Sequence, residues 1–430
     1  MREGRSAFKE GLMDERASGA VAERVREIVL GDFRQPAAPP AYPSRPLWAE
    51  LRRHGSELWL DTGDMGEVAS LWCREFTAVT TNNTLLNKEV QRGIYDQLIA
   101  KTARELKGTL ADRDMVLEIA FVLNAYHGLR LSREFGARVS VELHTDLAHD
   151  AERSVWYARR YFEIAPESFY IKVPFTAAGI IAARLLSNEC IPVNFTLGFS
   201  ARQNYLITAL ARPAFVNVFL GRLNSFVADY KLGTGKMVGE RAALASQRAV
   251  SELRAELGMP TRQIAASMRE GAQVASLVGV DVLTIPPKVA REFEELRLPA
   301  GAIASRIEEL PGVEVAPGVD RQALGLDGLW DVCGELKVAV LRLAQIDVAE
   351  LSPEGLSGLL VQLGFRCILP RWSEADIEAV TADGKIPRYD RWKSRLARQE
   401  VGLDALMTVS GLQSFAADQK AMDDRIRSML

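Results

Sequence analysis

Short apolar runs alternate with longer segments of helical spacing between about residue 57 and residue 300. Eight runs have the length and composition of buried strands: Leu58–Asp61, Ala78–Asn82, Arg138–Leu143, Phe169–Pro174, Ile191–Leu197, Phe215–Leu220, Arg262–Ser267 and Asp281–Pro286. The intervening segments, such as Ala177–Glu189 and Arg269–Val278, repeat apolar residues at helical intervals. Strands separated by helices pair in parallel, so eight such units predict an α/β fold, a closed (β/α)8 TIM barrel. An open doubly wound sheet is the alternative, but no G-x-G-x-x-G stretch follows the first run.

The chain outside this region divides into two further parts. Residues 1–45 predict an N-terminal arm and linker, with a short helix near Val21–Leu30 and a Pro-stiffened connector over Gln35–Pro40. We expect residues 46–300 to form the barrel and residues 301–430 to form a helical C-terminal extension. Apolar residues at near-helical intervals from Leu403 to Phe415 fit three alternatives: a helix over the barrel mouth, a self-association surface, or a plain packed helix.

Composition excludes several classes of protein. The chain has 430 residues, 48% of them hydrophobic, and 53 Lys plus Arg against 56 Asp plus Glu give a net charge of −3. A disordered chain or a non-specific nucleic-acid binder would need a stronger charge imbalance, so we expect no nucleic-acid partner. The cysteines are scattered without a C-x-x-C pair, and no apolar stretch approaches the roughly 20 residues of a membrane span. A cytoplasmic location without membrane attachment is therefore expected.

One lysine stands inside a run that should be entirely apolar. In Tyr170-Ile171-Lys172-Val173-Pro174, Lys172 points into the barrel if Ile171 and Val173 face the helices. A buried ammonium is costly unless the amine loses its proton, and a neutral amine attacks carbonyl carbons. The simpler alternative is a lysine held in an ion pair at a strand end.

Polar residues also close the other runs. They are Asp61, Asn82, Glu142, Asn194, Thr196, Asn217 and Ser267. Each alone fits a cap or a turn, and Asp61 before Thr62-Gly63-Asp64 could cap the following helix. Together they gather at the carboxyl ends of successive strands, which is where barrel enzymes place their active sites.

The residue types indicate a particular chemistry. A lysine with carboxylates, amides and a hydroxyl, without histidine or cysteine, suits imine formation on a polyhydroxy carbonyl compound. Arg222, Ser267 and Arg269 follow the sixth and seventh runs, and two guanidiniums with a hydroxyl would make a phosphate site. Each arginine alone also fits an ordinary solvated surface charge.

Six motifs in this order resemble the transaldolase family. They are Trp59-Leu60-Asp61-Thr62-Gly63-Asp64, Val79-Thr80-Thr81-Asn82-Asn83-Thr84-Leu85-Leu86, Tyr170-Ile171-Lys172-Val173-Pro174, Val193-Asn194-Phe195-Thr196-Leu197-Gly198-Phe199-Ser200, Phe219-Leu220-Gly221-Arg222 and Ala266-Ser267-Met268-Arg269. The resemblance covers roughly residues 57 to 300. It implies that Lys172 forms the Schiff base, that Asp61 takes the C4 hydroxyl proton, and that Glu142 and Thr196 hold the water that shuttles protons.

The resemblance also implies a substrate site and a reaction. The implied substrate-binding residues are Asn82, Asn194, Asn217, Phe219, Arg222, Ser267 and Arg269, the last three for the phosphate. The implied reaction moves a dihydroxyacetone unit from a ketose phosphate to an aldose phosphate, so sugar phosphates are the expected partners. No cofactor or metal is implied, and assembly into a homo-oligomer is left open.

The sequence departs from the family pattern in four places. Asn83 stands where a proline is usual, Asn217 where a serine commonly contacts substrate, and Phe175 and Ala177 alter the pattern after the lysine. The segment after the eighth run is longer than the closing helix that is usual in the family.

Two other functions stay open. In the smaller aldolases of this scaffold, a glutamine matches Glu142 and a tyrosine matches Phe219, so both residues here take the transaldolase form. The enzymatic alternative is nevertheless such an aldolase, a lyase that acts on fructose 6-phosphate. A phosphosugar-binding protein without catalysis is the alternative from another class.

Overall fold

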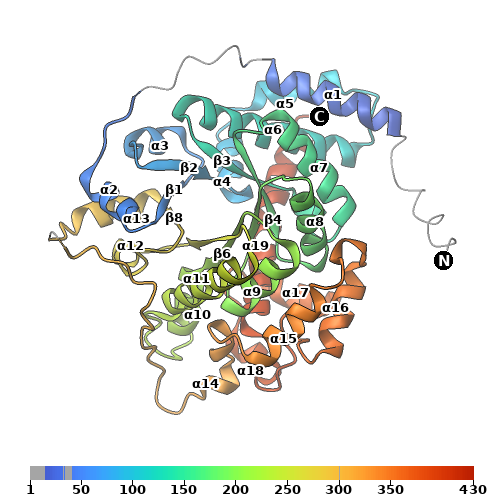
Figure 1. Cartoon of the computed structure of the whole chain (residues 1–430). Helices are drawn as coiled ribbons and strands as arrows, with labels where there is room; N and C mark the ends of the chain where they lie inside the picture. Colours follow the sequence, from blue (N-terminus) through green and yellow to red (C-terminus); the bar gives the residue numbers. More distant parts are fainter. Residues whose placement is uncertain (1–14, 32, 34–40, 300) are drawn as a thin grey trace.

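The protein is a closed barrel of eight parallel strands (Figure 1). The structure, a computed structural model, describes residues 15–31, 33, 41–299 and 301–430. The strands are β1 (Glu57–Asp61), β2 (Phe76–Thr80), β3 (Arg138–Glu142), β4 (Phe169–Pro174), β5 (Val193–Thr196), β6 (Phe215–Phe219), β7 (Arg262–Ala266) and β8 (Val282–Ile285). They follow the order of the chain around the barrel, and β8 pairs with β1 to close it. The predicted (β/α)8 barrel is confirmed.

Helices connect the strands, precede the barrel and follow it. In the N-terminal part and the barrel they are α1 (Glu15–Leu30), α2 (Pro46–Arg53), α3 (Met65–Leu71), α4 (Asn83–Gln91), α5 (Asp96–Glu105), α6 (Asp112–Phe135), α7 (Ala151–Ile164), α8 (Ala177–Asn188), α9 (Ala201–Ala211), α10 (Leu220–Asp229), α11 (Val238–Leu257), α12 (Ala272–Ser276) and α13 (Pro287–Glu295). In the extension they are α14 (Arg321–Leu324), α15 (Gly334–Leu343), α16 (Pro353–Gln362), α17 (Glu374–Asp383), α18 (Tyr389–Ala397) and α19 (Leu403–Arg427). Single 3₁₀ turns occur at Thr145–Leu147 (η1), Asp327–Leu329 (η2) and Val348–Glu350 (η3). Within the described ranges, no helix combines the length and the apolar character that crossing a membrane requires.

The N-terminal segment contains the predicted helix. α1 covers the expected Val21–Leu30 and begins six residues earlier, at Glu15, and it packs against α6 and α7. The predicted Pro-stiffened connector over Gln35–Pro40 lies outside the described residues. The next helix, α2, is followed directly by β1. α2 is held by Trp48, which is fully buried and donates a hydrogen bond from Nε1 to Glu294 at 2.7 Å.

Aromatic rings fill the lumen of the barrel at its middle. The rings of Trp59 and Tyr170 stack with centroids 5.3 Å apart, and Phe215 meets both edge-on at 4.9 Å. Trp59 lies two residues before Asp61 and Tyr170 two before Lys172, so each pair points to the same side of its strand. The rings therefore form an apolar floor beneath the polar residues, which lie nearer the carboxyl ends of the strands.

The orange helices of the C-terminal extension pack against one side of the barrel in Figure 1, whereas the red α19 runs on behind the centre of the view. α15 lies against α9, and α16 lies against α8. The extension is helical, as the sequence indicates. It ends in α19, which contacts α17 in the extension and reaches α4 and α6 on the other side of the barrel.

α19 crosses the mouth of the barrel. Its 25 residues span about 37 Å at the helical rise of 1.5 Å per residue. Its contacts follow one face of the helix and reach the ends of four strands: Thr408 with Leu197 after β5, Phe415 with Phe219 of β6, Asp418 with Thr84 after β2, and Asp423 with His144 after β3. Of the three alternatives for this segment, the helix over the barrel mouth is the one observed.

A buried ion pair anchors the start of α19. The Nε and Nη2 atoms of Arg202 each donate to a carboxylate oxygen of Asp404 at 2.7 Å, and Ser200 Oγ donates to the same carboxylate at 2.6 Å. Asp404 has no exposed surface. A Cβ added at Gly402 would lie 2.3 Å from Arg202 Nη2 and from Asp404 Oδ1, so a larger residue there would displace the ion pair.

Replacing Asp404 by Asn should destabilise the protein strongly. The substitution keeps the shape of the side chain but leaves the Arg202 charge buried without a counter-charge, which costs about 3–5 kcal/mol. Urea unfolding followed by tryptophan fluorescence measures the loss. Asp424→Asn is the matched control on the same helix, because Asp424 pairs with Lys420 and Arg427 at the surface and should be replaceable with little effect. Equal stabilities of the two variants would contradict the anchoring role of Asp404.

Candidate active site

The register of the barrel places three predicted site residues in one layer. Glu142 of β3 aligns with Lys172 of β4, and Lys172 aligns with Asn194 of β5. Aligned residues of parallel neighbours point to the same face, so all three side chains enter the lumen above the aromatic floor. Lys172 is only 2% exposed, and it lines the cavity at the mouth as the strand alternation predicts.

A cavity of about 220 Å³ opens above this layer, at the carboxyl ends of the strands. Most of the predicted site residues line it: Asp61, Asn82, Lys172, Asn194, Asn217, Phe219, Arg222, Ser267 and Arg269. The structure therefore brings together residues from six strands and the loops that follow them. Glu142 and Thr196 are buried next to this group but do not line the cavity.

Lys172 lies within the electrostatic reach of two carboxyl groups. Its Nζ donates a hydrogen bond to the carbonyl oxygen of Thr81 at 3.1 Å. Burial raises the pKa of Asp61 and the pKa of Glu142 above their usual ranges, and the Lys172 charge opposes both shifts. Arg269 and Lys88 oppose the shift at Asp61 as well. Both carboxyl groups therefore hold protons more tightly than ordinary surface carboxyls do.

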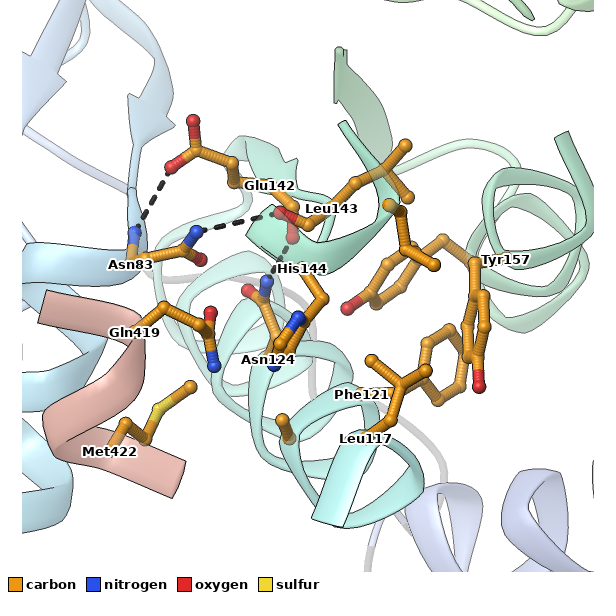
Figure 2. Close-up of a pocket in the computed structure, with 13 residues that line it drawn as sticks. Asn83, Leu117, Phe121, Asn124, Glu142, Leu143, His144, Tyr157, Gln419 and Met422 are labelled. Atoms are coloured by element: carbon orange, nitrogen blue, oxygen red, sulfur yellow. Dashed lines mark hydrogen bonds between the residues drawn. The ribbon is translucent and has the colours of Figure 1, made fainter. Parts of the chain in front are cut away.

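Glu142 is held by the backbone of a neighbouring loop. Asn83 N donates to Glu142 Oε2 at 3.0 Å, and the Asn83 side chain donates to the carbonyl oxygen of Leu143 (Figure 2). The hydrogen bond from the Asn83 backbone to the Glu142 carboxylate lowers the Glu142 pKa and so partly offsets the effect of burial. A proline at position 83, usual in the family that the sequence resembles, has no N–H to donate.

The pocket that Figure 2 draws is separate from the barrel cavity and much smaller. It lies between the end of β3 and the helices α6, α7 and α19, and its volume of about 10 Å³ fits no more than about one water molecule. His144 at its edge accepts a hydrogen bond from Asp146 N and meets Asp423 of α19 at 3.2 Å. The pocket is thus a packing defect under the barrel mouth and has no room for a substrate.

Helix caps account for some of the polar residues after the strands. Asp64, not Asp61, caps α3, because Asp64 Oδ1 accepts hydrogen bonds from the backbone of Gly66 and Glu67. Asp61 is therefore free of the capping role that the sequence allows. Asn82 has both roles: its Oδ1 accepts from Leu85 N at 2.9 Å to cap α4, and the residue lines the cavity.

The residues predicted to bind phosphate meet at the loops after β6 and β7. Arg222 lies in the first turn of α10, and Ser267 and Arg269 follow β7. The two loops touch at Gly221, where an added Cβ would lie 2.1 Å from the carbonyl oxygen of Ser267. Ser267 itself adopts a left-handed backbone with φ of 65°, which turns the chain sharply at the end of the strand.

Arg222 is a buried cation without a hydrogen-bond partner for one of its nitrogens. The residue is 7% exposed, and its Nη1 has no partner among the described residues. Burial, and then the positive charge of Arg269, lower the pKa of Arg222 to about 10. A buried guanidinium with an unsatisfied donor next to a second cation is arranged to receive an anion.

Three other predicted residues differ in how their polar atoms are used. Asn194 donates from Nδ2 to Ser140 at 2.9 Å, but its Oδ1 has no partner among the described residues. The same holds for Thr196 Oγ1, which is fully buried. Asn217 Oδ1 already accepts a hydrogen bond from Gly198 N at 3.3 Å. Asn194 and Thr196 therefore each keep a buried side-chain oxygen without a partner among the described residues.

The structure adds cavity residues that the sequence did not indicate. Thr284 of β8 donates to Thr80 of β2 at 3.1 Å, and both line the cavity. Threonine is common in strands, so neither position stands out in the sequence. Phe415 and Lys385 also line the cavity, and both belong to the extension. Phe415 ends the apolar pattern for which a helix over the barrel mouth was one alternative, but no local pattern relates Lys385 to the barrel rim.

Comparison with known proteins assigns the chain to a family. The family described as transaldolase/fructose-6-phosphate aldolase matches residues 58–323, which is more than half of the chain and includes nearly all of the barrel. The chain belongs to this family. Membership supports an enzyme built on a (β/α)8 barrel.

Individual relatives are moderately similar to the chain. A protein named transaldolase from Xanthomonas campestris pv. campestris (strain B100) is 33% identical over 246 residues, which are 54% of this chain and 74% of the relative. A transaldolase from Xanthomonas euvesicatoria pv. vesicatoria is 31% identical over 247 residues, with the same shares covered. A transaldolase from Chlamydia muridarum is 28% identical over 272 residues, 61% of this chain and 82% of the relative.

Because the pKa of Asp61 is raised in the folded protein, ionised Asp61 should lower the free energy of unfolding at neutral pH. The folded state binds the proton more tightly than the unfolded chain, so the cost is absent below the unfolded pKa and grows as the pH rises through the folded pKa. Urea unfolding should find Asp61→Asn more stable relative to the original protein at pH 8 than at pH 4.5.

Asp64→Asn is the control of opposite sign. Hydrogen bonding to Arg92 lowers the pKa of Asp64, so the stability it contributes is present at pH 8 and is lost as the pH falls. Asp64→Asn should therefore lose stability relative to the original protein at pH 8 and to the same extent at pH 4.5, and the loss should shrink only below the usual aspartate pKa of about 3.9, for example at pH 3. The same pH trend in both variants would contradict the assignment of a raised pKa to Asp61.

Proposed function

We propose that this protein is a transaldolase that works through a Schiff base on Lys172. The donor would be a ketose phosphate such as sedoheptulose 7-phosphate or fructose 6-phosphate, and the acceptor an aldose phosphate such as glyceraldehyde 3-phosphate or erythrose 4-phosphate. This is a reaction of the non-oxidative pentose phosphate pathway in the cytoplasm. The observation that carries the proposal is the buried Lys172 amine, which has the Asp61 and Glu142 carboxyls near it and shares one cavity with the cations Arg222 and Arg269.

The first step joins the ketose to the enzyme. Lys172 Nζ attacks the C2 carbonyl carbon, and the carbinolamine loses water to give an imine. Protons must pass from the amine to the departing hydroxyl, and we assign this transfer to Glu142 with a water held by Thr196. The burial of Glu142 fits this role, because its raised pKa brings the carboxyl nearer to a range in which it both gives and takes protons.

The second step breaks the bond between C3 and C4. Asp61 takes the proton of the C4 hydroxyl, the C3–C4 electron pair moves toward the protonated imine, and the aldose phosphate leaves. The dihydroxyacetone unit stays on Lys172 as an enamine. Its C3 then attacks the carbonyl carbon of the acceptor, Asp61 returns the proton, and hydrolysis of the new imine frees the product and Lys172. No redox or metal step is required for this sequence.

The other cavity residues position the substrate. Asn82 and Asn194 would hold sugar hydroxyls or the intermediate, with Asn217 and Phe219 beside them on β6. The phosphate would lie against Arg222, Ser267 and Arg269. A phosphate oxygen would satisfy the unpartnered donor of Arg222, which no residue in the described part of the chain satisfies.

Trapping with borohydride should identify Lys172 as the Schiff-base residue. The protein is incubated with fructose 6-phosphate and sodium borohydride, digested, and analysed by mass spectrometry for a reduced adduct. We expect the adduct on Lys172 alone and none in Lys172→Arg, whose guanidinium keeps the charge but forms no imine. Lys288 is an internal control, since it is exposed on α13 and pairs with Glu292. Failure to trap, or an adduct on another lysine, would contradict the mechanism and favour a binding protein without catalysis.

Dependence on an acceptor separates a transaldolase from an aldolase of the same scaffold. Consumption of fructose 6-phosphate is measured with and without erythrose 4-phosphate, together with any free dihydroxyacetone. A transaldolase consumes the donor in quantity only when the acceptor is present, because the enamine on Lys172 is released slowly. Asp61→Asn should reduce the acceptor-dependent rate about 10²–10⁴-fold through loss of the base. Equal rates with and without acceptor would favour the aldolase.

A further inference from the structure

One cation that lines the cavity comes from the extension. Lys385 lies in the loop between α17 and α18, more than 110 residues after Arg269 in the chain. It lines the same cavity as Arg222, Ser267 and Arg269. The extension thus contributes to the wall of the site as well as covering its mouth.

Lys385 is available to a ligand. Its side chain forms no ion pair or hydrogen bond within the described part of the chain, whereas most other lysines of the extension pair with carboxylates, as Lys393 does with Asp390 and Lys420 with Asp424. Asp418, whose charge opposes the lowering of the Arg222 pKa, accepts a hydrogen bond from Thr84. Arg222, Arg269 and Lys385 form no ion pair within the described part of the chain, so their side chains are open to an anionic ligand.

The loop that carries Lys385 is fixed in place on both sides. Ser410 Oγ on α19 donates to the carbonyl oxygen of Gly384 at 2.8 Å, and Pro387 is buried. Gly384 has φ of 84° and ψ of −149°, a backbone region that essentially only glycine adopts. Asp383 accepts hydrogen bonds from Arg388 N and from Trp392 Nε1, which close the loop around Lys385. Lys385 is thus presented to the cavity by a defined conformation.

A phosphate monoester fits this arrangement. The group carries close to two negative charges at neutral pH, so the single buried Arg222 leaves charge uncompensated. Arg269 and Lys385 are both exposed at the rim, where they would meet the outer oxygens of a phosphate whose inner oxygen reaches Arg222. Phe415 packs against Phe219, and the guanidinium carbon of Arg222 lies 5.7 Å from the centroid of the Phe415 ring. α19 therefore also supplies an apolar surface behind the guanidinium.

We propose that Lys385 is a third cation of the phosphate site, so that the C-terminal extension takes part in recognising phosphorylated sugars. This inference rests on the proposed function for the identity of the sugar, but not for the binding of phosphate. Lys385 is a binding residue in this proposal and takes no part in the bond-making steps.

Calorimetric titration with inorganic phosphate tests the proposal without any need for catalysis. In Lys385→Gln the Kd for phosphate should rise about 5–10-fold, which corresponds to the loss of one charged hydrogen bond of about 1–1.4 kcal/mol. Lys385→Arg should keep most of the affinity. Lys393→Gln is the matched control, because it removes the same charge from an exposed helix of the extension whose lysine does not line the cavity.

Two outcomes would overturn the proposal. One is an unchanged Kd in Lys385→Gln, and the other is an equal loss in Lys393→Gln, which would indicate only a general effect of net charge. If borohydride trapping succeeds, the KM for fructose 6-phosphate should rise in Lys385→Gln by a factor similar to that of the Kd. If trapping fails, the phosphate titration still decides the role of Lys385, so failure of the proposed function and failure of this inference give different results.

Discussion

The burial of one amine in a closed barrel constrains the rest of this site. Lys172 stands on a floor of stacked aromatic rings, in a lumen that backbone strands enclose on every side. Because an unpaired ammonium is costly there, the neighbouring positions must supply acceptors and opposite charge. The carbonyl of Thr81 and the carboxyls of Glu142 and Asp61 do so, and they in turn are buried. The cost of burying these charges is a general feature of active sites whose residues exchange protons.

The position of the C-terminal extension depends on a second buried charge pair, Asp404 with Arg202. Through this position the extension adds residues to the wall of the cavity. Asp404 and Arg202 fix the start of α19 beside the loop after β5, and from there the direction of the helix carries it over the mouth. The helical geometry is regular over this length. The Asp404–Arg202 ion pair at the start of α19 and the Asp423–His144 contact near its end therefore determine where the residues facing the barrel lie. Phe415 therefore lies over β6, and the α17–α18 loop, which is hydrogen-bonded to α19, lies beside the same strand ends.

The sequence predicted the barrel and most of its lining because strand geometry is periodic. Alternation along β4 places Lys172 in the lumen, and parallel strands bring Asp61, Asn194 and Asn217 to one rim, so polar residues in apolar runs mark the site. The contribution of Asn83 to Glu142 is made by a backbone N–H, which carries no residue signature. Lys385 could not be predicted, because its place depends on the tertiary packing of the extension and its local sequence resembles any surface loop.

The two ends of the cavity differ in charge, and this difference limits how a ligand lies. In a ring of eight strands in chain order, β3 and β4 face β7 and β8, so the amine and Glu142 stand across the lumen from the loop that carries Arg269. A ligand with a carbonyl at one end and a phosphate at the other must then span the mouth beneath α19, with its middle carbons near Asp61 and Asn82. The loop of Lys385 is hydrogen-bonded to Ser410, and a Cβ added to the next residue, Gly411, would lie 3.5 Å from Arg222 Nη1, so this loop meets the cavity on the same stretch of α19 that covers Arg222. A cation placed near β3 would instead have competed with Lys172 for Glu142, and the direction of α19 keeps the Lys385 loop away from that side.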